Sequence, residues 1–168
     1  GKLEALVPRA RLEQEFENGK AMADHPPAEI IQRGSGWGAL EAMRRRKAGE
    51  PPFCSAALVF DEGTLGPEQS AWMSLLENGD MPAADPAAGL ASFMVQAEWR
   101  EMLDVAVRKR GTANWTEWLQ LGIMRGYAGD LAGAREAFRR SVDASRTVWG
   151  LRNLAVIARL DRNMEEAC

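Results

Sequence analysis

The stretch from Asn114 to Arg146 constrains the fold most, because it predicts two helices joined by a tight turn. Asn114 is a favoured N-cap residue, and apolar or small side chains recur after it at helical spacing. Gly129 suits the position just past a helix, and Asp130 suits the start of the next helix. The expected apolar faces consist of Trp115, Trp118, Leu119, Gly122 and Ile123 in the first helix and of Leu131, Ala134, Ala137, Phe138, Ser141 and Val142 in the second.

This pair of predicted helices resembles a tetratricopeptide repeat. That motif has an aromatic residue, a Leu-Gly pair, a Gly-Asp turn, a small residue, a second aromatic residue and another small residue. The matching residues here are Trp118, Leu121-Gly122, Gly129-Asp130, Ala134, Phe138 and Ser141. Two positions depart from the motif, because Arg125 stands where an aromatic residue is usual and Arg146 where proline is usual. Glycine inside a helix costs about 1 kcal/mol relative to alanine, so we expect the backbone of the second helix to approach Gly122 closely.

A single helix pair cannot bury its own apolar face, so a repeat needs neighbours. A shift of 33 residues aligns Leu154-Ala155 with the Leu-Gly pair, and it places Asn163, Met164 and Ala167 in the turn and the helix that follow. A shift of 35 residues in the other direction aligns Trp99, Leu103 and Ala106 with the second helix. The resemblance therefore implies an all-α fold. Antiparallel helix pairs would stack as an α-solenoid over residues 90–168, with the last repeat truncated, and an irregular N-terminal segment, residues 1–89, would pack on the repeats.

Composition and charge argue against several other classes of protein. The net charge of −3 is unusual for a nucleic-acid-binding domain, and the sequence has neither a run of 18 apolar residues nor a signal peptide. Two distant cysteines and one histidine form no disulfide framework and no metal-binding spacing. We therefore expect a cytoplasmic protein without a metal, a cofactor, a nucleic-acid partner or a membrane span. Arginine outnumbers lysine 17 to 4, a bias typical of GC-rich bacterial genomes.

The N-terminal half predicts shorter elements. A helix is expected over residues 2–24 and ends before His25, whose position beside two prolines makes a catalytic role improbable. A helical turn is expected over residues 28–33, a helix over 39–48, and an extended segment without a pairing strand over 53–62. Pro67 should open a further helix, with Trp72, Leu75 and Leu76 on its apolar face and Gly79 at its end. Residues 81–89 form a Pro/Ala-rich loop, the clearest break in the chain.

The glycine-rich stretch ahead of Ala39 is the first candidate site, formed by Gly34, Ser35, Gly36 and Trp37. Such a loop before a helix N-terminus can bind an anion, and Trp37 could stack on a sugar. The spacing matches neither a P-loop nor a dinucleotide-binding motif. The simpler interpretation is a tight turn in which Trp37 fills the core, and the sequence leaves both open.

The second candidate site follows from the tetratricopeptide resemblance, which implies a concave groove lined by the first helices of successive repeats. Arg152 and Arg159 are seven residues apart and share one helix face, where they could pair with carboxylates of a peptide. They could equally be solvated helix residues. The residues placed in this groove are Gln120, Ile123, Tyr127, Trp149, Arg152, Asn153, Val156 and Arg159.

A broader resemblance covers residues 26–168. The order of the blocks GSGWGALE, LGPEQSAW, LLENGDMPAADP, MVQAEWREML and LRNLA is similar to the C-terminal part of large bacterial proteins of unknown function. In those proteins a mutarotase-like β-sandwich precedes tetratricopeptide repeats, so a carbohydrate would be bound through the parent protein. The chain begins with Gly1 and ends within a predicted helix, and we therefore expect a fragment of a longer protein.

The leading functional hypothesis is a non-catalytic helical interaction module that binds another protein or the upstream domain of its own parent. One alternative is an accessory part of a bacterial carbohydrate-active enzyme whose catalytic domain lies outside this chain. A second alternative is a structural spacer or dimerisation element. No pair of carboxylates in the sequence identifies a catalytic site, since the separation that a glycosidase needs cannot be inferred from spacing.

Overall fold

The computed structural model describes residues 8–24, 32–54 and 58–160. The chain divides into two compact units, Gly1–Gly66 and Pro67–Cys168, so residues 67–89 belong to the same compact unit as the predicted repeats. Helices dominate the described residues, as the predicted all-α class requires. His25, Asn163, Met164 and Ala167, on which several expectations depend, lie outside the described residues.

The first unit contains two helices and a short pair of strands. Helix α1, Arg9–Asp24, exposes all of its side chains whose burial is described. Helix α2, Gly36–Ala48, begins three residues before the predicted start and ends at Gly49, which has the left-handed φ of 70°. The Asp61 side chain accepts a hydrogen bond from the Gly63 N–H and so caps the short 3₁₀ helix η2, Glu62–Thr64.

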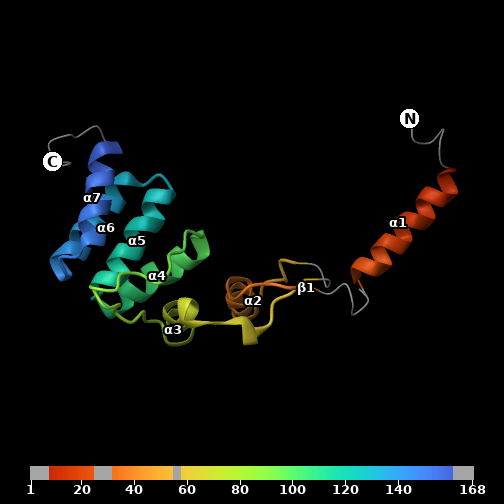
Figure 1. Ribbon diagram of the computed structural model, residues 1–168, viewed down its shortest axis with the longest axis horizontal. Coiled ribbons are helices and arrows are strands. Elements are labelled where there is room, and N and C mark those ends of the chain that lie inside the picture. Colours follow the sequence, from red (N-terminus) through yellow and green to blue (C-terminus); the bar gives the residue numbers. More distant parts are fainter. Residues whose placement is uncertain (1–7, 25–31, 55–57, 161–168) are drawn as a thin grey trace. The chain divides into compact units, whose positions relative to one another are not determined.

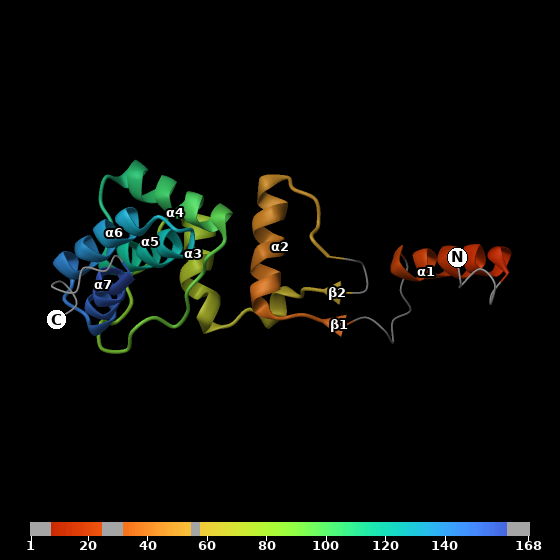
Figure 2. The ribbon, with the colours of Figure 1, turned by 90° about the horizontal axis from the view of Figure 1, so that it is seen from above.

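The strands β1, Gln32–Arg33, and β2, Leu58–Val59, pair in parallel, and Figure 2 shows them beside α2. This pairing contradicts both the helical turn expected at residues 32–33 and the absence of a pairing strand expected for residues 53–62. The cause is a tertiary contact that no local pattern reveals. The Phe60 ring lies so close to Gly34 and Gly38 that a Cβ at either glycine would come within 2.0 Å of it. Packing of Phe60 therefore holds the two segments together.

The second unit begins with the 3₁₀ helix η3, Pro67–Gln69, and the helix α3, Ser70–Asn78. Trp72, Leu75 and Leu76 are buried on α3, and Gly79 ends the helix with a φ of 75°, as predicted. Helix α4 spans Ala97–Arg110. The Trp72 and Trp99 rings meet edge to face with their centroids 5.9 Å apart, so α3 packs directly on α4.

Helices α5, Trp115–Tyr127, and α6, Leu131–Ala144, form the predicted pair, and α7, Val148–Leu160, lies beside α6 (Figure 1). Asn114 and Glu117 form a capping box at the start of α5, and Asp130 caps α6 through the backbone N–H of Gly133. Gly129 has a φ of 84°, which explains the glycine in this turn. The buried core of this part consists of Trp115, Leu119, Ala134, Phe138 and Ile157.

Two contacts explain why glycine stands at position 122 and arginine at position 125. A Cβ at Gly122 would lie 2.4 Å from the Phe138 ring, so only glycine leaves room for this side chain of α6. The close approach that we expected from the α6 backbone is made by a side chain instead. Arg125 donates to Asp104 Oδ1 at 2.8 Å and to the Gly133 carbonyl at 3.4 Å. The arginine that replaces the usual aromatic residue thus links α5 to both α4 and α6.

Candidate functional site

One half of the predicted groove is covered by the protein itself. The Met81–Ser92 segment, which contains the Pro/Ala-rich loop, lies against the N-terminal half of α5 and passes α7 (Figure 2). Thr116 Oγ1 accepts a hydrogen bond from the Ala84 N–H at 2.8 Å, and Gln120 Nε2 donates to the Ser92 carbonyl at 2.7 Å. Gln120 is only 2% exposed, so this predicted groove residue faces its own chain.

The same segment also covers Trp149 of α7. A Cβ at Gly89 would lie 2.5 Å from the Trp149 indole, and the φ of Gly89 is 78°. Only glycine combines this backbone conformation with so close an approach. Trp149 is half-buried and packs on the core of α5, α6 and α7, so its role in the structure is to hold the Met81–Ser92 segment.

The other half of the groove is open. A cavity of about 180 Å³ lies between α5, α6 and α7, and three of the predicted groove residues, Ile123, Asn153 and Val156, line it. Apolar side chains make up most of its wall. The full lining is Gly122, Ile123, Gly126, Leu131, Phe138, Asn153, Val156, Ile157 and Leu160. We call this cavity the α5–α7 groove.

Exposed apolar side chains continue the α5–α7 groove onto the surface. Val156 is 43% exposed and Leu160 is 58% exposed, although both line the cavity. Tyr127, at the C-terminal end of α5, is 74% exposed. Exposed apolar area is a usual sign of an interaction surface when it is contiguous. The structure therefore brings the predicted residues Asn153 and Val156 together with a surface that remains uncovered among the described residues.

The two predicted arginines lie beside this groove. Arg152 and Arg159 are exposed and share a helix face with Val156, and neither forms an ion pair with any described residue. Asn153 is half-buried and donates from Nδ2 to the Trp149 carbonyl at 2.8 Å. This local bond accounts for the Asn153 amide without a ligand, whereas the arginines remain available for one.

The glycine-rich candidate site is not the loop that we predicted. Gly36, Trp37 and Gly38 already belong to the first turn of α2, and only Gly34 and Ser35 precede it. The Ser35 side chain makes no capping hydrogen bond, and Trp37 is half-buried. Contact with Phe60 explains the need for glycine at positions 34 and 38.

The strongest electrostatic cluster of the described residues lies on α2. Arg44 is 4% exposed and binds Glu50 and Glu41 through distances of 2.6 to 3.0 Å. Its hydrogen bonds to Glu50 and then Glu41 raise the pKa of Arg44 above its ordinary value, and the bond to Arg44 lowers the pKa of Glu50. Ion pairing within the cluster therefore accounts for both pKa shifts. Within the described ranges no three His, Cys, Asp or Glu side chains could hold a metal ion, and no helix there is long and apolar enough to cross a membrane.

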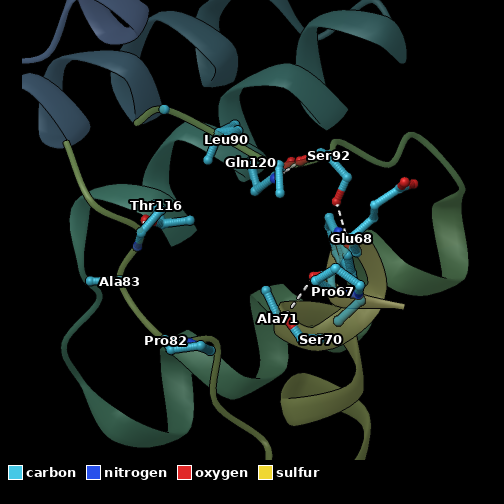
Figure 3. A pocket seen from close by; sticks show the side chains of 14 residues that line it. Pro67, Glu68, Ser70, Ala71, Pro82, Ala83, Leu90, Ser92, Thr116 and Gln120 are labelled. Carbon is cyan, nitrogen blue, oxygen red and sulfur yellow. Dashed lines mark hydrogen bonds between the residues drawn. The ribbon is translucent and has the colours of Figure 1, made fainter. Parts of the chain in front are cut away.

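A second cavity, which the sequence did not indicate, lies between α3, the Met81–Ser92 segment and α5 (Figure 3). Its volume is about 240 Å³, and buried Trp72 and Gln120 contribute to its wall. No sequence signal indicated this cavity, because Gln120 was predicted as a groove residue and Trp72 as part of an apolar helix face.

Comparisons with protein-family models, with curated proteins and with solved structures gave no match for this chain. The resemblance to tetratricopeptide repeats therefore depends on the motif residues alone. Its functional consequences, and those of the broader resemblance to bacterial proteins with a mutarotase-like domain, stay predictions.

Proposed function

We propose that residues 67–168 are a non-catalytic, tetratricopeptide-like interaction module whose α5–α7 groove binds an acidic segment of a partner protein or of its own parent. In this proposal α5 and α6 are one repeat and α7 is the first helix of the next. The capping of α5 by Asn114, the turn at Gly129-Asp130 and the contact of Gly122 with Phe138 support the repeat.

The observation that carries the proposal is the exposure of Val156 and Leu160 at the mouth of the α5–α7 groove. An apolar side chain of a partner would cover both and fill a cavity of about 180 Å³. Burial of apolar surface stabilises a complex by roughly 25 cal/mol per Å² before the costs of association. A binding hot spot usually consists of an anchoring side chain in a pocket, and the contacts around it exclude water.

Charge determines which partner fits. Residues 67–168 contain 12 basic and 14 acidic side chains, a net charge of −2, so only the local charge beside the groove favours an acidic segment. Arg152 and Arg159 add two exposed guanidinium groups beside the groove. Arginine pairs with carboxylates in a two-bond geometry, so a segment with carboxylates near an apolar anchor would match both features.

The test is a capture experiment with matched variants of the full chain. Wild-type protein and the Val156→Asp variant would be immobilised and exposed to lysate of the native host, and the retained proteins would be quantified. We expect Val156→Asp to abolish retention of the specific partner, because it places a carboxylate in the apolar wall. Raising the salt concentration should weaken retention as well, because exposed charge pairs are screened.

Leu151→Asp is the matched control, since Leu151 lies on the same helix with 40% exposure and does not line the groove. It should retain the partner as the wild type does. Equal retention by folded Val156→Asp and wild type would contradict the proposal, and so would equal loss in both variants. Circular dichroism of each variant would establish that α7 is intact.

A further inference from the structure

Helix α1 exposes the apolar side chains that a helix normally buries against a neighbour. Leu12 is 37% exposed and Phe16, one turn further along, is 71% exposed. A Cβ built at Gly19 would find no described atom within 4 Å. Leu12, Phe16 and Gly19 follow one another at intervals of four and three residues, which is the spacing of a coiled-coil seam. The seam of α1 therefore consists of two apolar side chains followed by a gap at Gly19.

Several features of α1 are unfavourable in a helix that stands alone. It has 16 residues, and isolated helices of about 12–15 residues are marginal in water. Glycine inside a helix costs about 1 kcal/mol relative to alanine. The first turn contains Arg9 and Arg11 and no acidic residue, although the helix dipole favours negative charge there. A partner that covers the seam and faces the first turn with negative charge would compensate for these features.

A second copy of α1 in the antiparallel direction matches the seam in size. About a twofold axis at positions 17 and 18, Phe16 of one copy faces Gly19 of the other, and the reverse contact follows by symmetry. The absent side chain at Gly19 leaves room for the Phe16 ring. In a parallel pair Phe16 would face Phe16 and Gly19 would face Gly19, and the two glycines would leave a void that close packing disfavours.

The antiparallel pair also matches α1 in charge. In the same alignment Glu13 and Lys20 of the other copy flank the seam on one side, and the symmetry repeats this pair on the second side. The basic first turn with Arg9 and Arg11 lies beside the C-terminal end of the other helix, where the dipole is negative. A parallel pair would instead bring two basic first turns together.

We propose that α1 is a self-association element that pairs in the antiparallel direction with α1 of a second copy of this chain. Phe16 packs against Gly19 of the other copy, and Glu13 pairs with its Lys20. The interface is short, so the dimer forms reversibly, as is usual for interfaces below about 1,200 Å². Helix α1 belongs to the first unit, so this pairing is independent of the α5–α7 groove in the second.

The first experiment is sedimentation equilibrium of the full chain at low ionic strength and at concentrations up to about 1 mM. We expect a reversible monomer–dimer equilibrium for the wild type. Gly19→Gln should weaken it by about tenfold or more, because the new side chain fills the gap that Phe16 needs. Ala21→Gln is the matched control, since Ala21 is exposed and lies on the other side of the helix, and it should leave the equilibrium unchanged. Glutamine favours a helix at both positions, so unfolding of α1 cannot explain a loss confined to Gly19→Gln.

A charge exchange tests the direction of the pair. Glu13→Lys and Lys20→Glu should each weaken the dimer by roughly two- to fivefold, as expected for exposed ion pairs, and the double variant should restore it. Glu13 also pairs with Arg9 of its own helix at 2.9 Å, and the single Glu13→Lys and the double variant both lose that contact. A wild-type chain that stays monomeric, equal association of the two glutamine variants, or a double variant as weak as the single ones would each overturn the proposal.

Discussion

Gly122 and Gly126 are one helical turn apart on α5, and they differ in the space that a methyl group would find. A Cβ at Gly122 would meet the Phe138 ring at 2.4 Å, whereas a Cβ at Gly126 would meet Ala134 Cβ at an ordinary 3.6 Å. Glycine at position 122 is required by the packing of Phe138, whereas position 126 has space for a methyl group.

We therefore predict that Gly122→Ala lowers the free energy of unfolding by about 1–3 kcal/mol, the usual cost of overpacking. Gly126→Ala should raise it by about 0.5–1 kcal/mol, because alanine loses less backbone entropy in a helix. Urea unfolding of both variants measures the two effects. A stabilising Gly122→Ala would show that α6 is not packed on α5 as described.

Single residues also show where reasoning from sequence stops. The capping role of Asn114 and the turn at Gly129 follow from local chemistry, and both were predicted. The bond of Arg125 to Asp104 was not, because it joins residues 21 positions apart and depends on how α4 packs on α5. Among the candidate site residues, Ile123, Asn153 and Val156 were expected in the groove and line it, while the burial of Gln120 by a distant segment could not be inferred.

At the scale of elements, the cluster around Arg44 ties α2 to the segment that follows it. Arg44 connects Glu41 within the helix to Glu50 beyond its end. Because the bond to Arg44 lowers the pKa of Glu50, folding favours its ionised form. The resulting stabilisation is fully present above the ordinary glutamate pKa of about 4.3, and it is lost as the pH falls through the lowered value.

We predict that the first unit loses stability in acid and that Glu50→Gln removes much of this pH dependence. Trp37 is the one tryptophan of residues 1–66, so its indole resonance reports on that unit during urea unfolding at pH 7, 4 and 3. Glu15→Gln on exposed α1 is the control and should preserve the wild-type dependence. An unchanged pH dependence in Glu50→Gln would refute this role of the cluster.

Elements differ in how far local sequence determines them. Helices α5 and α6 have capping residues, Asn114 and Asp130, and apolar periodicity of their own, so they were predicted close to their observed bounds. The strands β1 and β2 exist because Phe60 packs on Gly34 and Gly38, and the early start of α2 accompanies that contact. Residues 81–89 were correctly expected to be irregular, but the helices resume only at Ala97, and the hydrogen bonds of the segment to Thr116 and Gln120 depend on the folded helices.

At the scale of the whole molecule, the second unit contains both the α5–α7 groove and the cavity beside the Met81–Ser92 segment. The border at residue 66 assigns α3 and the Met81–Ser92 segment to the same compact unit as α4 to α7. The segment covers the N-terminal half of α5, whereas the α5–α7 groove stays uncovered among the described residues. We therefore propose that a partner with an apolar anchor binds at Val156.

Site-specific photo-crosslinking tests that claim most directly. A benzophenone side chain would be placed at position 156 or at position 151 of the full chain in the native host, and covalent adducts would be identified by mass spectrometry. We expect the benzophenone at position 156 to form a defined adduct with an acidic segment and the benzophenone at position 151 to form none. Adducts from position 151 alone, or the same adducts from both positions, would contradict it.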